Sequence, residues 1–114
     1  MKYVHFSLPL ISGNYNAVNL FLENSSKLDI DFNEAIEEGV TGLMWACRTT
    51  PSDRFLVLSA IFRHAGKVSI DFNRKTIKGQ TAYAILVSDT ENDNTEALRL
   101  FRENADKFNI DLTV

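Results

Sequence analysis

The sequence predicts an all-α repeat protein, in which helix–turn–helix units stack side by side and hairpin-like loops join them. The main observation is a period of 40 residues: the tetrapeptide Ile-Asp-Phe-Asn at 30–33 returns unchanged at 70–73 and as Ile-Asp-Leu-Thr at 110–113. Other positions share this period, namely Lys27, Lys67 and Lys107, and Val18, Leu58 and Leu98. A fixed period of this size is typical of repeats that bury their apolar faces against each other. We therefore expect one domain, 1–114, made of three units at 1–33, 34–73 and 74–114.

The first unit is expected to contain a helix from Tyr15 to Asn24. A break at Ser12-Gly13-Asn14 precedes this helix, and apolar residues then follow at helical spacing: Ala17, Val18, Leu20, Phe21 and Leu22. The segment before the break, residues 1–11, has one positive charge and a short apolar stretch, as a signal peptide does. Because a histidine and a proline interrupt that stretch, we expect a first helix of the stack there instead.

The middle unit is expected to contain two helices. The hydroxyl of Thr41 can cap a short helix from Gly42 to about Arg48. Thr50 and Pro51 then mark the start of a longer helix, because proline favours the first helical position. Its apolar face is expected to be Phe55, Leu58, Ile61 and Phe62, and Gly66 is expected to end it.

The last unit repeats this plan. Thr81 precedes a short helix through Tyr83 to about Ser88, and a polar loop at 91–94 follows. Asp93 or Asn94 can then cap a longer helix, whose expected apolar face is Leu98, Phe101, Ala105 and Phe108.

The links between units, 30–39 and 70–79, read as extended segments that end in a glycine turn, so we expect protruding hairpins or loops. Their aspartates and asparagines recur with the period, at Asp31, Asp71 and Asp111 and at Asn33 and Asn73. A calcium site would gather its ligands within about a dozen residues. We therefore expect these side chains to hold the turns by bonding nearby backbone.

These residues resemble the ankyrin repeat. Residues 39–47, Gly-Val-Thr-Gly-Leu-Met-Trp-Ala-Cys, are similar to that family's opening Gly-x-Thr-Pro-Leu-His-x-Ala-Ala, and 79–84 are a weaker copy. Residues 13–24 are similar to its second helix, and 70–73 to its Asp-Val-Asn tail. The chain departs from the family at Gly42 and Ala82, where proline is usual, at Met44 and Ala84, where histidine is usual, and in its period, which exceeds the usual ~33.

A HEAT-type repeat is the alternative all-helical reading, because its period is also near 40. The Gly-x-Thr turns and the extended tetrapeptides favour the ankyrin reading, since HEAT units need neither.

The resemblance implies a non-catalytic protein–protein interaction module, a scaffold or adaptor, that binds a partner protein through hairpin tips and the concave face of its short helices. The candidate partner-binding residues are Glu37, Glu38, Val40, Trp45, Arg48, Thr49, Arg74, Lys75, Ile77, Lys78, Gln80, Ser88 and Asp89. The first tip is acidic and the second is basic, which suits a dipolar partner, or else keeps the hairpins soluble or lets neighbouring tips attract each other. Trp45 is either a binding anchor or a packing residue between units. The alternative function is a targeting or regulatory ankyrin domain of a larger enzyme or of a secreted bacterial effector.

Composition limits the other function classes. The chain has 114 residues, 45% hydrophobic and 24% charged, with a net charge of −3, so the basic surface that nucleic acid usually requires is not expected. A single cysteine, Cys47, rules out an internal disulfide and favours a cytoplasmic protein, in the host cytosol if it is an effector. No apolar run approaches the ~18 residues of a membrane span.

Catalytic chemistry is not expected either. His5 and His64 lie far apart without neighbouring ligands, and Cys47 occupies a position where the repeat needs a small buried residue. We therefore expect no enzyme activity, no metal and no cofactor. The first unit is apolar at Tyr3, Val4, Phe6, Leu8, Leu10 and Ile11. We expect further sequence of a longer array to cover that face, or the face to support self-association.

Overall fold

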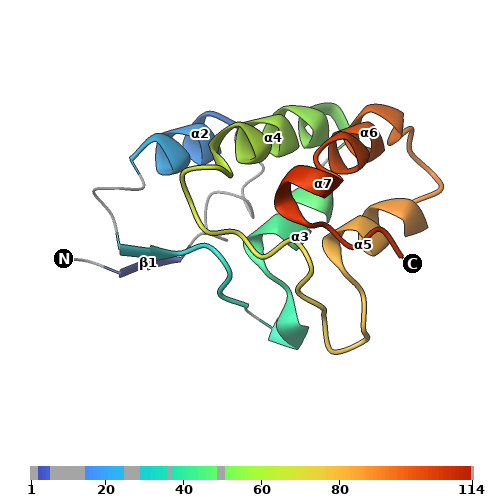
Figure 1. Ribbon diagram of the computed structural model, residues 1–114, viewed down its shortest axis with the longest axis horizontal. Helices are drawn as coiled ribbons and strands as arrows, with labels where there is room; N and C mark the ends of the chain where they lie inside the picture. The colour runs from blue at the N-terminus through green and yellow to red at the C-terminus, as the bar shows by residue number, and fades with distance from the viewer. Residues whose placement is uncertain (1–2, 6–14, 25–28, 36, 49–50, 114) are drawn as a thin grey trace.

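The computed structural model describes residues 3–5, 15–24, 29–35, 37–48 and 51–113. Helices dominate them, as expected, in a body with a radius of gyration of 13.0 Å and extents of 40 × 27 × 27 Å. Three long elements form one layer in Figure 1, and two short helices lie beneath them. The long elements are α2 (Tyr15–Glu23), α4 (Pro51–His64) and α6 (Thr95–Glu103), which α7 (Ala105–Phe108) extends, and the short ones are α3 (Gly42–Arg48) and α5 (Ala82–Ser88).

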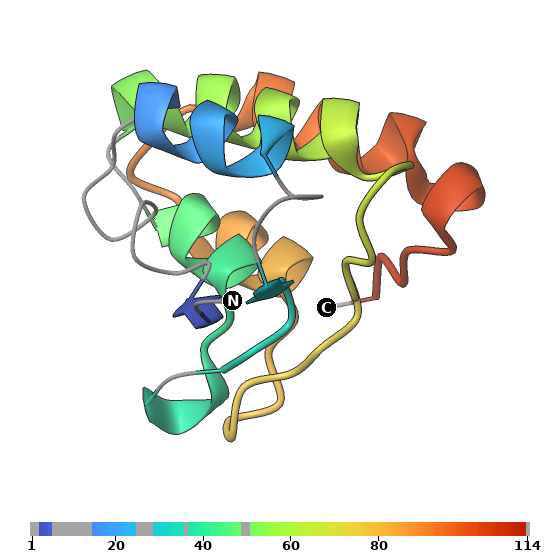
Figure 2. The same ribbon diagram turned by 90° about the vertical axis from the view of Figure 1, so that its left-hand side faces the viewer.

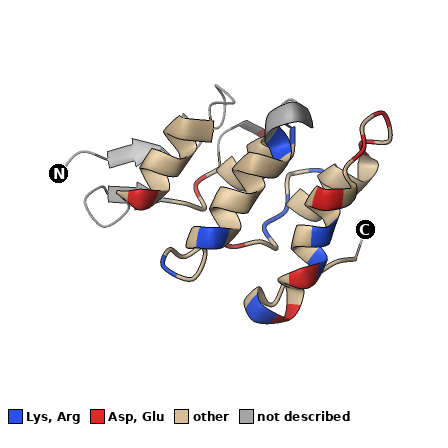
Figure 3. Cartoon of the chain, turned by 90° about the horizontal axis from the view of Figure 1, so that it is seen from above, with Lys and Arg blue, Asp and Glu red and all other residues tan. Residues whose placement is uncertain are grey.

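Helices that are equivalent in the 40-residue period are neighbours in space. α2 packs against α4 and α4 against α6, and Figure 3 shows these helices side by side. In the layer below, α3 packs against α5. Figure 2 shows the connecting loops projecting together on the side away from the long helices.

The expected N-terminal helix is wrong for residues 3–5, which form a strand. β1 (Tyr3–His5) pairs in parallel with β2 (Asp29–Asp31), with Val4 opposite Ile30. The physical reason is that residues 29–31 are extended and offer a strand edge, and a β-branched residue such as Val4 suits such pairing. The remainder of 1–11 lies outside the described residues.

The threonine caps explain where the short helices begin. The backbone N–H of Met44 donates to Thr41 Oγ1 at 3.4 Å, and that of Ala84 donates to Thr81 Oγ1 at 3.1 Å. These bonds satisfy first-turn donors that have no partner within the helix. α4 begins at Pro51, as expected, and ends at His64, two residues before Gly66; its expected cap, Thr50, lies outside the described residues.

The last long helix is interrupted rather than continuous. α6 ends at Glu103 and α7 begins at Ala105. Between them, the side-chain amide of Asn104 donates to the carbonyl of Leu100 at 2.8 Å. The backbone N–H of Asn104 donates to the same carbonyl at 3.2 Å, so at the break the Leu100 carbonyl accepts from both groups of Asn104.

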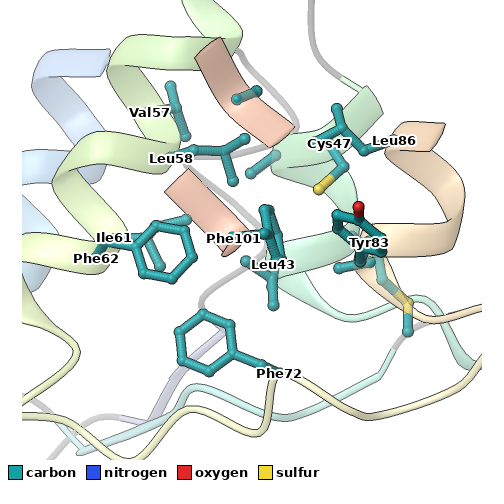
Figure 4. Close-up of a cluster of buried hydrophobic side chains, with 14 of the residues drawn as sticks. Leu43, Cys47, Val57, Leu58, Ile61, Phe62, Phe72, Tyr83, Leu86 and Phe101 are labelled. Atoms are coloured by element: carbon teal, nitrogen blue, oxygen red, sulfur yellow. The ribbon is translucent and has the colours of Figure 1, made fainter. Parts of the chain in front are cut away.

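The core lies between the two helical layers and is richest in aromatic rings where the middle and last units meet (Figure 4). The ring of Phe62 stacks on Phe72 with centroids 5.1 Å apart, and it meets Phe101 edge-on at 5.2 Å. Aromatic pairs of these geometries contribute about 0.5–1.5 kcal/mol beyond burial. Phe72 belongs to the repeated tetrapeptide, so the repeat motif helps to build the core.

One core prediction on α4 is wrong. Leu58, Ile61 and Phe62 are buried as expected, but Phe55 is 40% exposed. Arg54 beside it is only 5% exposed. The turn of the helix that was expected to bury Phe55 instead buries the arginine, because acceptors in the last unit receive its guanidinium.

Candidate functional site: a groove beside the second hairpin tip

A hydrogen-bond ladder joins the tails of successive units. The side-chain amide of Asn33 donates to the carbonyl of Ser69 at 3.0 Å, and its oxygen accepts from the backbone N–H of Asp71. Asn73, 40 residues later, donates to the carbonyl of Asn109 at 2.9 Å and accepts from the N–H of Asp111 at 2.7 Å. The same two bonds are thus made twice, one period apart. The sequence predicted that these asparagines bond nearby backbone, but they reach across to the next unit.

Two aspartates of the motif, Asp71 and Asp111, do hold their own turns, as predicted, and the side chain of Asp31 lies outside the described residues. Asp71 Oδ1 accepts from the backbone N–H of Asn73 at 2.9 Å, and Asp111 Oδ1 accepts from that of Thr113 at 3.0 Å. The hydroxyl of Thr113 also donates to Asp111 Oδ1 at 2.7 Å. These bonds from Thr113, with a smaller contribution from the charge of Lys75, lower the pKa of Asp111. Thr113 therefore bonds within its own turn, at a position where the earlier units carry asparagine.

The second hairpin tip, residues 74–80, is a tight turn built around Thr76. The backbone N–H of Thr76 donates to the carbonyl of Gln80 at 2.9 Å, and that of Gly79 donates to the carbonyl of Thr76 at 2.8 Å. The Thr76 hydroxyl accepts from the N–H groups of Lys78 and Gln80, so the side chain is buried inside the tip. Gly79 has φ +80°, a conformation that glycine adopts without steric cost.

The first hairpin tip, residues 34–40, stacks against the second. The N–H of Ile77 donates to the carbonyl of Glu38 at 2.9 Å. Gly39 lies so close that a Cβ there would sit 3.3 Å from the N of Ile77 and the Cα of Thr76. Figure 2 shows the two tips together at the foot of the molecule. One flank of the second tip is therefore covered by the first.

The other flank of the second tip faces an open groove of about 400 Å³. The tip forms one wall, α5 forms another, and the C-terminal segment, which ends near α5 in Figure 1, closes one side. The lining residues are Lys75, Gly79, Gln80, Thr81, Ala84, Val87, Ser88 and Thr113.

The groove lies on a helix face that is covered one unit earlier. The equivalents of Ala84 and Val87 in α3 are Met44 and Cys47, which are each 1% exposed, and α5 packs against that helix. In α5, Ala84 is half-buried and Val87 is 37% exposed. The groove is thus the stacking face of the last short helix, which no described residue covers.

Several expected partner-binding residues come together here. Lys75, Gln80 and Ser88 line the groove although they come from two different elements. Arg74, Ile77 and Lys78 lie on the solvent side of the same tip, and Ile77 is 75% exposed. The second tip and α5 therefore form one continuous surface.

Other expected residues lie elsewhere. Glu38 and Arg48 are exposed away from the groove, on the first tip and at the end of α3. Val40 is only 4% exposed and belongs to the core, where a partner cannot reach it. Trp45 is half-buried against the core, and its indole N–H is buried without an acceptor among the described residues. The side chain of Glu37, and Thr49 as a whole, lie outside what the structure describes.

Asp89 has a structural partner. The guanidinium of Arg54 donates from one nitrogen to Asp89 Oδ2 at 2.9 Å and to the Asn94 side-chain oxygen. A hydrogen bond from Asn92 and the nearby Arg54 lower the pKa of the Asp89 carboxyl, against a smaller opposing effect of burial. This cluster ties α4 to the loop after α5, and so it fixes the end of α5 that carries Ser88.

The Cys47 thiol is buried in α3. Burial raises the pKa of the Cys47 thiol to about 12, despite the opposing charges of Arg54 and Arg48, so the thiol stays neutral. Among the described residues, no group of three His, Cys, Asp or Glu side chains could hold a metal ion. Nor is any described helix long and apolar enough to cross a membrane.

Comparison with models of known protein families finds no match to this chain, and comparisons with curated proteins and with solved structures find no significant match either.

Proposed function

We propose that this chain is a non-catalytic protein–protein interaction module with the architecture of an ankyrin-like solenoid. The sequence period is repeated at the level of individual bonds, which supports this proposal. Asn33 and Asn73 make the same pair of inter-unit bonds, and Thr41 and Thr81 cap equivalent helices. Stacked repeats of this kind provide extended surfaces for macromolecular partners.

The observation that carries the proposal is the meeting of the second tip and α5 around one groove. Lys75 and Gln80 come from the tip and Ser88 from the helix, and all three line the same space. The hydrogen bonds of Thr76 and the stacking of the first tip hold the tip in place. A preorganised surface loses little conformational entropy when a partner binds.

The composition of this surface fits a protein partner. Ile77 and Val87 are exposed apolar side chains, and basic and polar groups surround them. Protein interfaces commonly combine a few apolar anchors at the centre with a polar rim. We propose that Ile77 and Val87 are such anchors and that Lys75 and Lys78 belong to the rim.

Affinity capture from cell lysate tests the proposal. The variants are the double substitution Lys75→Glu with Lys78→Glu, and the matched control Lys67→Glu, which reverses an exposed charge after α4. We expect the specific partners of the wild type to disappear with the double variant and to persist with the control. Partners that are unchanged by the double variant, with circular dichroism showing all three proteins folded, would remove the second tip from the binding surface.

A further inference from the structure

We infer that the groove receives an acidic, extended peptide segment of a partner protein, whose carboxylates face the second tip while an aliphatic side chain rests on α5. This inference rests on the proposed function and specifies the chemistry of the partner.

The charges around the groove are its first support. Among the described residues that line the groove, Lys75 alone is charged, and residues 74–80 carry three bases and no acid. None of Arg74, Lys75 and Lys78 forms an ion pair with a described acidic side chain. The charge of Lys75 contributes to the lowered pKa of Asp111, but Oδ1 of that carboxylate already accepts two hydrogen bonds from Thr113. The tip therefore offers positive charge that an incoming carboxylate can neutralise.

The first tip is an acidic segment that already forms a main-chain hydrogen bond with the second tip. It carries Glu34 and Glu38, and its Glu38 carbonyl accepts the N–H of Ile77 at 2.9 Å. The 3-10 turn Glu37–Gly39 thus lies along one flank of the basic tip and is joined to it through main-chain atoms. We infer a main-chain contact on the other flank as well, made there by an extended segment.

The carbonyl and the glycine that occupy the equivalent positions in the second tip are not covered by a described residue. The carbonyl of Lys78 corresponds to that of Glu38, and it accepts no hydrogen bond from a described residue. Gly79 corresponds to Gly39, and no described atom lies within 4 Å of where its Cβ would be. A peptide in extended conformation can approach this glycine closely and donate a backbone N–H to the Lys78 carbonyl.

The floor of the groove selects an apolar side chain. Ala84 and Val87 of α5 line the groove. Their equivalents in α3 are Met44, which is larger than alanine, and Cys47, which is buried. Replacement of Met by Ala leaves a depression, and the groove volume of about 400 Å³ accommodates an aliphatic side chain together with backbone. Burial of apolar surface there adds affinity to the charge contacts.

Selection from a phage-displayed library of random peptides, each about a dozen residues long, tests the inference on the complete chain. We expect the selected peptides to combine several Asp or Glu residues with a central aliphatic residue. Their binding should weaken about tenfold for Lys75→Glu, stay unchanged for Lys67→Glu, and decline as salt is raised. In ¹⁵N–¹H spectra of the protein, they should shift the amide signals of Gly79, Ala84 and Ser88.

The outcomes separate the inference from the proposed function. Neutral or basic peptides that shift the same amides would overturn the acidic partner but support binding at this surface. Selected peptides that shift only amides on the outer faces of the long helices would overturn both. Binding of phosphatidylserine vesicles, or self-association of the chain, in place of peptide binding would also overturn the inference.

Discussion

Removal of the Asn73 side chain should weaken the contact between the middle and last units. The substitution Asn73→Ala deletes one donor and one acceptor, which bond to the carbonyl of Asn109 at 2.9 Å and to the N–H of Asp111 at 2.7 Å. The backbone N–H of Asn73 still reaches Asp71 Oδ1, so the local turn is retained. The loss is therefore confined to the inter-unit bonds.

The size of the effect follows from those two bonds. A protein hydrogen bond contributes a net ~0.5–1.5 kcal/mol, so the pair contributes about 1–3 kcal/mol to the free energy of unfolding. Asn73 is half-buried, so water can partly replace its partners and the upper end of this range is not expected. With a urea m-value of about 2 kcal/mol/M for a small domain, the unfolding midpoint should fall by roughly 0.5–1 M.

Urea unfolding followed by circular dichroism measures this shift. Asn73→Thr, which gives the middle unit the residue found at position 113, should lose stability to a similar degree, because a threonine bonds within its own turn. Asn16→Ala, on the exposed face of α2, is the control and should change the free energy of unfolding by less than about 0.7 kcal/mol. An Asn73→Ala midpoint equal to that of the wild type would refute the reasoning that these bonds hold the units together.

Three further predictions test other parts of the structure. Gly39→Ala should destabilise more than Gly79→Ala, because both have φ near +80° but only Gly39 is packed against the second tip; the two urea midpoints compare them, and equal midpoints would contradict the stacking of the tips. Cys47 should resist a disulfide reagent in the native protein and react fully when the protein is unfolded, and rapid labelling of the native protein would contradict its burial. The free energy of unfolding should fall as pH rises from about 9 to 12, because the thiol of the unfolded chain ionises first. The bond from Asn92 lowers the pKa of Asp89, so this carboxylate should stabilise the fold above its ordinary pKa of 3.8, and the stabilisation should be lost as pH falls below that value. Asp89→Asn should therefore reduce the loss of stability in acid, and an unchanged loss would contradict this role.

Local signals in the sequence predicted most of the helices. Thr41 and Thr81 precede apolar residues at helical spacing, and each caps its helix in the structure. Such signals depend only on residues within one or two helical turns, so they can be recognised in the sequence alone. The break at Asn104 was not predicted, because asparagine is tolerated within a helix.

Contacts between distant residues could not be predicted in the same way. The strand at Tyr3–His5 depends on an edge that Asp29–Asp31 provides, and the burial of Arg54 depends on Asp89 and Asn94. From the sequence alone, an arginine beside a phenylalanine is expected to be exposed and the phenylalanine to be buried. In the structure Arg54 is buried and Phe55 is exposed, because Asp89 and Asn94 bind the guanidinium.

The groove was predicted only in part. The 40-residue period indicated that Lys75, Gln80 and Ser88 belong to a tip and to the end of a short helix, but it did not show that they share one space. The signal that could have indicated the groove is the change from Met44 to Ala84 at equivalent positions, since a smaller residue on a stacking face leaves room.

Site-specific photo-crosslinking to a captured partner tests most directly whether the second tip and α5 form the binding surface. A photo-reactive phenylalanine derivative in place of Ser88 places the probe in the groove, and the same derivative in place of Leu56 places it on the exposed face of α4. We predict a cross-linked product from position 88 and none from position 56. A product from position 56 alone would contradict the account.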